Sequence, residues 1–287
     1  MKYVKKITGW VFGILFILVL LAMGLTHLME QQTTLSELTD HFDTTGFQPE
    51  EHETVFDEGT LYYVTYGDST KTPLLLIHGS PGDWTGWKEL MVQPEVYTNY
   101  FIIAIDRIPY HQTTIKGSYS LTEQSDYLKP VMDRYCSPCV VAGHSYGGAL
   151  ALQVGAAYPD QVAAVLSIAG TIAAPFQKPK WYNRVLNSPL QYLIAPFFRA
   201  SNNEMLRLSD DLYPLEKQLA NTRIPLFFIQ GGADVLVAPE SATYLQSKIP
   251  DTDTVLYYDA LRDHFVIWSD IPIVLEALET IRLKLNL

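Results

Sequence analysis

The sequence is poor in cysteine, with two among 287 residues. They stand together in Cys136-Ser-Pro-Cys139, and neither a second cysteine pair nor a His-x-x-x-His motif follows them, which argues against a zinc site. A thioredoxin-like centre needs such a pair at a helix start after a strand, whereas this pair precedes a predicted strand. We therefore expect a local disulfide or two unreactive thiols, with a redox protein as the alternative.

Basic residues are scarce as well, with 20 Lys and Arg against 31 Asp and Glu. Three of the lysines, Lys2, Lys5 and Lys6, stand at the start of the chain. Without them the chain has 17 basic and 31 acidic residues, a formal charge of −14 with histidine neutral. A body this acidic is not expected to bind nucleic acid or an anionic lipid surface.

Residues 7–29 lack charged side chains altogether when His27 is neutral. About 20 apolar residues are enough to span a bilayer as a helix. The lysines before this run favour a cytoplasmic N-terminus, which places the body outside the cytoplasm. The sequence thus predicts a membrane anchor over residues 1–29. The alternative is a cleaved signal segment, because Ala22-Met23-Gly24 has the pattern of a cleavage site, and the protein would then be secreted or periplasmic.

The rest of the chain has the pattern of a folded α/β body. Residues 30–53 are polar and acidic, and we expect them to form a linker. A hairpin is then predicted around Asp57-Glu-Gly59. Continuous apolar runs alternate with helical stretches, which is typical of parallel strands buried on both faces. The predicted strands are 74–77, 101–105, 140–142, 162–168, 225–229 and 254–258, and the predicted helices include 83–91, 121–135, 145–158 and 271–285.

Residues 171–222 interrupt this alternation, because they contain five prolines and no strand-like run. We expect them to form an inserted, mostly helical lid over a core made of residues 54–170 and 223–287. Six aromatic side chains of this segment are expected to form the lid's own core rather than to contact substrate. They are Phe176, Trp181, Tyr182, Tyr192, Phe197 and Phe198.

Ser145 stands at the centre of Gly143-His-Ser-Tyr-Gly147, a G-x-S-x-G motif between a predicted strand and a predicted helix. A strand that turns directly into a helix strains the serine backbone, and only small neighbours fit beside the crossing chain. Ligands of open parallel sheets bind beyond the carboxyl ends of the strands. Loop 78–82, Asp234 and His264 also follow predicted strands, and we expect them at the same edge as Ser145.

Ser, Asp and His in this order suit nucleophilic catalysis. A serine hydroxyl needs a base within hydrogen-bonding reach, and His264 would take the proton of Ser145 and return it to the leaving group. Asp234 would hold the imidazole in the required tautomer and stabilise its cation. The backbone N–H groups of Ser80 and Tyr146 would stabilise the oxyanion.

Over residues 55–285 the chain resembles the α/β-hydrolase superfamily, in the branch with a lid after the sixth strand. The motifs that carry the resemblance are H-G-S-P-G at 78–82, G-H-S-Y-G-G at 143–148, G-G-A-D at 231–234 and D-H-F at 263–265. This branch includes esterases, proline iminopeptidases, epoxide hydrolases and dehalogenases. The resemblance implies an α/β-hydrolase fold with a helical lid and no cofactor. It makes Ser145 the nucleophile, Asp234 the acid and His264 the base, with Ser80 and Tyr146 as oxyanion donors.

Epoxide hydrolases and dehalogenases of this superfamily use aspartate where this chain has Ser145. The sequence therefore predicts a serine hydrolase that cleaves a carboxylic ester or related acyl bond of a small-molecule substrate. A proline iminopeptidase-like aminopeptidase, suggested by H-G-S-P-G, is the alternative within enzymes. It would need carboxylates to hold the substrate amine, for which Glu204, Asp210 and Asp211 are candidates. A binding protein that keeps the fold without catalysis is a further alternative.

The chain departs from the family at two places. The family usually has D-R-P-G-Y-G-x-S after the second buried strand, whereas residues 106–113 read D-R-I-P-Y-H-Q-T, with both glycines replaced. Asp263 stands where a glycine often precedes the base, which would place a second carboxylate near His264. We expect His78 and His144 to pack rather than to transfer protons. The other histidines, His41, His52 and His111, show no metal-ligand spacing, and no metal is predicted.

Overall fold

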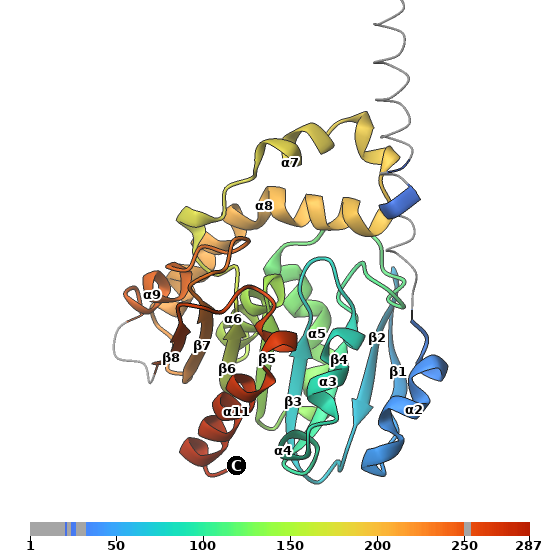
Figure 1. The fold of residues 1–287 in the computed structure, drawn as a ribbon, viewed down its shortest axis with the longest axis vertical. Coiled ribbons are helices and arrows are strands. Elements are labelled where there is room, and N and C mark those ends of the chain that lie inside the picture. The colour runs from blue at the N-terminus through green and yellow to red at the C-terminus, as the bar shows by residue number, and fades with distance from the viewer. Residues whose placement is uncertain (1–20, 22–23, 27–32, 250–253) are drawn as a thin grey trace, which may run out of the picture.

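The computed structural model describes residues 21, 24–26, 33–249 and 254–287, and eight strands of this part form one sheet (Figure 1). The strand order is β1-β2-β4-β3-β5-β6-β7-β8. The pairs β1–β2 and β2–β4 are antiparallel, and all others are parallel. The predicted α/β class with a mainly parallel sheet is confirmed. The strands are β1 Glu50–Phe56, β2 Gly59–Tyr66, β3 Thr72–Ile77, β4 Tyr100–Ile105, β5 Cys139–His144, β6 Val162–Ile168, β7 Leu226–Gly231 and β8 Thr254–Asp259.

Helices cover both faces of the sheet, which explains why its central strands are continuously apolar (Figure 1). Successive side chains of β3 point to opposite faces. Leu75 packs in the core that contains α5 Leu121–Tyr135 and α6 Tyr146–Ala157. Leu74 and Leu76 pack in the core that contains α11 Ile271–Leu285. The ranges predicted for α5 and α11 are those observed, whereas 83–91 is a 3₁₀ helix, Trp84–Trp87, followed by the short helix α3 Lys88–Met91. The other short helices of the core are α4 Pro94–Tyr97, α9 Ser241–Gln246 and α10 Val266–Ser269.

The segment before β1 packs on the core and is not a free spacer. The 3₁₀ helices Leu35–Leu38 and Asp43–Thr45 flank the helix α2 Thr39–Phe42. Phe42 is fully buried, and its ring centroid lies 5.1 Å from that of Tyr66. The linker expected over residues 30–53 is thus corrected for residues 33–53, because apolar side chains among the acidic ones anchor this segment and β1 pairs with β2.

The predicted anchor, residues 1–29, lies almost entirely outside the described residues, which include only 21 and 24–26 of it. Within the described part of the chain, no helix combines the length and the apolar character that crossing a membrane requires. Thr26 accepts a hydrogen bond from the N–H of Ala195 at 3.3 Å, so the end of this run contacts the segment between β6 and β7. The membrane anchor stays a prediction.

Residues 171–222 connect β6 to β7 and lie over the carboxyl edge of the sheet (Figure 1). The longest helix of this lid, α8 Pro196–Leu219, buries leucines every three to four residues against the core: Leu208, Leu212, Leu215 and Leu219. The shorter α7 Trp181–Leu186 packs on the outer side of α8 (Figure 1). Two further 3₁₀ helices belong to the lid, Ala174–Phe176 and Pro189–Leu193.

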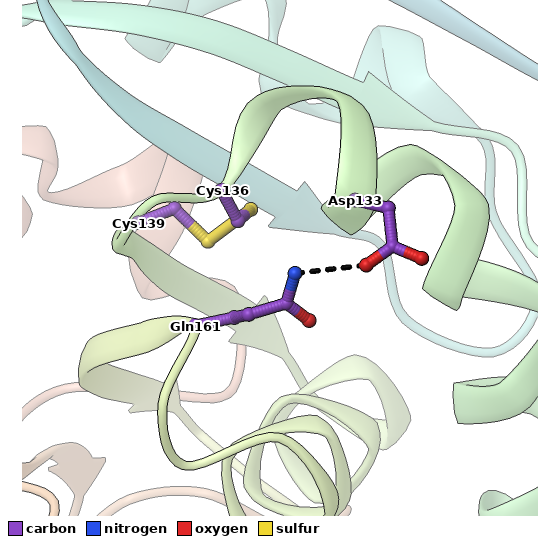
Figure 2. The surroundings of a disulfide bond; sticks show 4 residues. All are labelled: Asp133, Cys136, Cys139 and Gln161. Atoms are coloured by element: carbon purple, nitrogen blue, oxygen red, sulfur yellow. Dashed lines mark hydrogen bonds between the residues drawn. A yellow bond between two sulfur atoms is a disulfide. The ribbon is translucent and has the colours of Figure 1, made fainter.

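Cys136 and Cys139 form a disulfide between α5 and β5 (Figure 2). Both are buried, and Asp133 nearby accepts a hydrogen bond from Gln161 Nε2 at 2.9 Å. The disulfide lies at the amino end of β5, whereas Ser145 follows its carboxyl end. Of the two expected states, a local disulfide or two unreactive thiols, the structure has the disulfide.

Candidate active site

Ser145 forms the corner between β5 and α6, with φ 55° and ψ −119°. Few non-glycine residues adopt such a backbone, and the surrounding chain holds it in place. A Cβ atom at Gly143 would lie 2.0 Å from the carbonyl oxygen of Gly147, and one at Gly147 would lie 2.2 Å from that of Ile77. Glycine is therefore required at both positions by close backbone contact.

His264 and Asp234 are buried and adjacent, with His264 Nδ1 2.8 Å from Asp234 Oδ2. Asp234 Oδ1 accepts the N–H groups of Leu236 and Val237 at 2.9 and 2.8 Å. Burial raises the pKa of Asp234, but the hydrogen bonds from His264 and from these two N–H groups outweigh it, so the pKa lies below its ordinary value. Asp234 is therefore a carboxylate at neutral pH, and Nε2 is the His264 nitrogen that can accept a proton.

Two cavities meet at Ser145 and His264, and both are also lined by Ser80 and Leu236. The lid cavity has about 400 Å³ and is lined mainly by the lid, with the apolar side chains Phe176, Tyr182, Leu186, Ile194, Phe198, Met205 and Val237. The loop cavity has about 330 Å³ and extends along residues 78–87, with Trp87, Phe265, Ile267 and Trp268. Ser145 and His264 can thus be reached from both cavities.

The loop after β3 crosses directly beside the serine. A Cβ atom at Gly79 would lie 3.1 Å from Cβ of Ser145. Ser80 follows Gly79, and its hydroxyl group bonds to Ser201 Oγ at 2.9 Å and to Tyr110 Oη at 3.1 Å. Tyr146 is the first residue of α6. The structure therefore gathers all five predicted site residues at one edge of the sheet.

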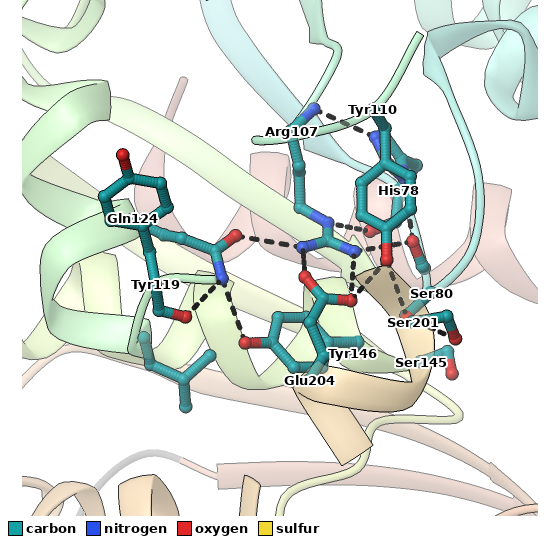
Figure 3. A network of polar contacts seen from close by, with 12 residues as sticks. His78, Ser80, Arg107, Tyr110, Tyr119, Gln124, Ser145, Tyr146, Ser201 and Glu204 are labelled. Carbon is teal, nitrogen blue, oxygen red and sulfur yellow. Dashed lines mark hydrogen bonds and ion pairs between the residues drawn. The ribbon is translucent and has the colours of Figure 1, made fainter. Parts of the chain in front are cut away.

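A buried ion pair between Arg107 and Glu204 ties this loop to the lid (Figure 3). Arg107 follows β4 and donates from Nε to the carbonyl of His78 at 2.9 Å and from Nη2 to that of Gly79 at 2.8 Å. Its Nη1 lies 2.7 Å from Glu204 Oε1 of α8, and Tyr110 Oη donates to Glu204 Oε2 at 2.7 Å. Burial lowers the pKa of Arg107, but Glu204 outweighs this effect and raises it overall. The D-R dipeptide at 106–107 was the only sequence signal for this network.

The carboxylates suggested for an aminopeptidase lie outside both cavities. Glu204 is neutralised by Arg107 instead of being available to a substrate amine. Asp211 accepts the N–H of Leu121 at 3.3 Å, and Asp210 is exposed. None of the three lines the lid cavity or the loop cavity. The sequence-based suggestion for these residues is therefore corrected.

Two buried histidines, His78 and His144, contact the backbone of residues that form the site. His78 Nε2 accepts the N–H of Arg107 at 2.9 Å, and His144 Nε2 lies 2.9 Å from the carbonyl oxygen of His264. Burial lowers the pKa of His144 to about 3 and that of His78 well below its ordinary range, so both are neutral. Their partners fit the packing role expected for them.

The remaining polar residues near the base give no metal site. Asp263 is exposed and accepts the N–H of Phe265 at 2.8 Å, so its carboxylate caps the following turn. Among the residues that the structure describes, no group of three or more His, Cys, Asp and Glu is arranged to hold a metal ion.

His111 takes the place of a family glycine, and its backbone keeps the conformation that glycine favours, with φ 48°. Its Nδ1 lies 2.6 Å from Asp106 Oδ2. Burial lowers the pKa of His111, but the hydrogen bond to Asp106 outweighs it and raises the pKa overall. The contact with Asp106 thus offsets the cost of a left-handed residue.

We predict that His111→Ala is less stable than His111→Gly by about 1 kcal/mol, because both lose the imidazole but only glycine adopts a positive φ without strain. Urea unfolding monitored by circular dichroism measures the difference. The matched control is Asp210 in α8, where alanine should be the more stable of the two because glycine weakens helices. Equal stability of the two His111 variants would contradict the assigned backbone strain.

A mainly parallel eight-stranded sheet, with a serine elbow after a central strand and a helical lid between β6 and β7, defines the α/β-hydrolase fold. The alpha/beta hydrolase family profile matches residues 74–275, and the chain belongs to this family. Human epoxide hydrolase 4 is 28% identical over 143 residues, which are 48% of this chain and 37% of that protein. Lipase LipV of Mycobacterium tuberculosis is 31% identical over 115 residues, 39% of this chain and 42% of the lipase. The chain thus matches less than half the length of either relative.

Solved structures agree with this fold. A carboxylesterase structure from the thaumarchaeon Nitrososphaera gargenis superposes with a TM-score of 0.66 and 19% identity, over 83% of this chain and 99% of that one. At this identity the similarity shows the shared fold alone. The family membership, together with lipases and epoxide hydrolases among the relatives, supports hydrolase activity.

Proposed function

We propose that the protein is a serine hydrolase that cleaves a carboxylic ester or related acyl bond through an acyl-enzyme formed on Ser145. One observation carries the proposal. Ser145 and His264, which is paired with Asp234 at 2.8 Å, line the walls of both cavities, where a substrate carbonyl could meet them. A nucleophile, a base and an orienting carboxylate are the groups that acyl transfer requires.

In the proposed reaction, Ser145 Oγ attacks the substrate carbonyl carbon while His264 Nε2 accepts its proton. Asp234 stabilises the resulting imidazolium. The N–H groups of Ser80 and Tyr146 bind the oxyanion, and the amino end of α6 adds a favourable dipole. His264 then protonates the leaving group, the carbon–heteroatom bond breaks, and water deacylates Ser145 with the same histidine as base.

Two observations favour this chemistry over the alternatives. The relatives include epoxide hydrolases, but the elbow of this chain carries a serine, whereas the family's epoxide hydrolases use aspartate there. The aminopeptidase alternative needs a free carboxylate, but the single carboxylate in the described walls of the two cavities is Asp83. Asp83 already accepts hydrogen bonds from the N–H and the hydroxyl group of Thr85. The complete set of predicted site residues argues against a binding protein without activity.

We also propose that residues 7–29 anchor this hydrolase in a membrane with its body outside the cytoplasm. The lysines before the apolar run support this orientation. The disulfide between Cys136 and Cys139 fits an oxidising compartment.

We predict that a fluorophosphonate probe labels the full-length protein at Ser145, because a serine activated by a neighbouring base attacks the phosphorus of the probe, expels fluoride and becomes phosphonylated. Mass spectrometry of the labelled peptide checks the position. Ser145→Ala should not be labelled, whereas Ser247→Ala, at an exposed serine just after α9, should be labelled like the wild type. Labelling that persists in Ser145→Ala, or a wild type that neither reacts nor hydrolyses activated esters, would refute the proposal. Turnover of short acyl esters against proline arylamides then separates the esterase from the aminopeptidase.

A further inference from the structure

The outer part of the lid has a charge opposite to that of the rest of the protein. Residues 161–203 contain no Asp or Glu, although the whole chain has 31 of them. The same stretch contains four basic residues, Lys178, Lys180, Arg184 and Arg199. The net negative charge of the body predicts that it does not bind an anionic lipid surface. That prediction does not hold for the lid, because a positive region lies there within an otherwise acidic protein.

Large apolar side chains of the same segment are exposed. The expectation that the six lid aromatics form the lid's own core is wrong for the four that are exposed, Phe176, Trp181, Tyr182 and Tyr192. Phe197 and Phe198 are partly buried and pack on each other. Trp181 and Tyr192 are 76% and 71% exposed. We call the following side chains of this segment the lid face: the exposed Phe176, Trp181, Tyr182, Val185, Leu190, Tyr192, Lys178, Lys180 and Arg184, and the partly buried Arg199. The guanidinium of Arg199 lies 5.4 Å from the ring centroid of Tyr192.

The lid face has the composition of a surface that binds at a membrane interface. Clustered exposed apolar side chains on a soluble body indicate an interaction site. Tryptophan and tyrosine prefer the level of lipid headgroups, where their apolar rings and polar atoms are both satisfied. Lysine and arginine beside them attract anionic headgroups. Most protein–protein interfaces, by contrast, are depleted in lysine.

The position of the lid face agrees with such a contact. Figure 1 shows α7 as the outermost layer, on the side of α8 away from the sheet. Residues 24–26, at the end of the predicted membrane anchor, lie beside the lid, and Thr26 bonds to the N–H of Ala195. Residues 24–26 and the lid face are therefore at the same end of the described structure.

The lid face is also continuous with the lid cavity. Phe176, Lys178, Lys180 and Tyr182 belong to both, and the cavity reaches Ser145 and His264 at its inner end. A molecule that leaves a lipid layer at the lid face could therefore enter the cavity without crossing the acidic surface of the body.

We propose that the lid face docks on the surface of an anionic lipid bilayer, with Trp181 and Tyr192 at the headgroup level and the four basic residues against the lipid charges. This contact is separate from the predicted anchor, because it involves the folded body. It requires no catalytic step and goes beyond the proposed hydrolase activity.

A dye at position 181 tests the contact. The full chain with Trp181→Cys, labelled with an environment-sensitive dye, is reconstituted in nanodiscs of phosphatidylcholine with or without phosphatidylglycerol. We expect a shift of emission to shorter wavelength, and quenching by spin-labelled lipid several times stronger with phosphatidylglycerol than without it. The matched control is Val55→Cys, at an exposed apolar residue of β1, and should show neither effect. Tyr192→Cys repeats the test if the first variant unfolds.

Charge reversal provides an independent arm. Lys178→Glu combined with Arg184→Glu should abolish the dependence of the quenching on phosphatidylglycerol, whereas Lys71→Glu, at an exposed lysine just before β3, should leave it unchanged.

Equal quenching at positions 181 and 55 would overturn the proposal. A signal that depends on protein density and not on lipid charge would also overturn it, because a second copy would then cover the lid face. These fluorescence signals do not depend on turnover, so a failed docking test leaves the proposed hydrolase activity open, and the reverse is also true.

Discussion

Alanine at Ser145 is expected to lower kcat for an activated ester by on the order of 10⁶-fold, as seen where serine, histidine and aspartate act as one unit. His264→Ala should lower kcat by about the same factor, because a serine without a base is a poor nucleophile. Asp234→Ala should lower kcat by less, about 10⁴-fold, because the imidazole is still present but has lost the carboxylate that orients it. Single-turnover kinetics with an excess of enzyme measure these rates.

The double variant Ser145→Ala with His264→Ala distinguishes this mechanism from two independent contributions. Its activity should be no lower than that of either single variant, since each already disables the same proton transfer. Ser145→Ala should unfold at the temperature of the wild type or above it, and circular dichroism should show that the His264 variants remain folded. Losses that multiply in the double variant, or Ser145→Ala with a tenth of the wild-type rate, would rule out the proposed roles.

Glu204→Leu is expected to lower the free energy of unfolding by about 3–5 kcal/mol, because it leaves the Arg107 guanidinium buried without a counterion. Adding Arg107→Met should restore most of this loss, since an apolar pair of similar volume can replace a buried ion pair. Denaturant unfolding of the four proteins in this cycle gives the coupling between the two side chains. Activity should fall in Glu204→Leu as well, because Arg107 holds the carbonyls of His78 and Gly79 beside the nucleophile.

Arg207 and Asp211 provide the control on the same helix. Their side chains are 3.6 Å apart and partly exposed, so Arg207→Met should cost less than about 1 kcal/mol. If Glu204→Leu cost no more than Arg207→Met, or if the double variant were less stable than Glu204→Leu alone, the buried pair would not have the role assigned to it.

The sequence predicted the central sheet well because its strands are buried on both faces and therefore read as unbroken apolar runs. The range of α5 was predictable for a local reason: Ser120 caps its first turn and accepts the N–H of Glu123 at 3.2 Å. Ser145 was predictable because the elbow is formed by contiguous residues whose glycines have no sterically acceptable replacement.

Contacts between distant residues could not be predicted in this way. Arg107 and Glu204 are 97 positions apart, and no periodic pattern indicates that a lid carboxylate turns inward. The exposure of the lid aromatics could not be predicted for a similar reason. A proline-rich segment without regular periodicity does not show which of its faces is covered. His111 has a left-handed backbone, but the sequence does not indicate this because glycine is absent from the position. The contact with Asp106 stabilises the histidine in this conformation.

The buried pair of Arg107 and Glu204 also bears on how such proteins diverge. Both ends of a lid inserted between two strands emerge at one edge of the sheet, which by itself makes the lid easy to exchange for another. Here an exchanged lid without a carboxylate opposite Arg107 would leave a charge inside the protein next to the nucleophile. Positions 107 and 204 should therefore have changed together during evolution, and a graft of this lid onto a related scaffold would have to bring its arginine partner with it.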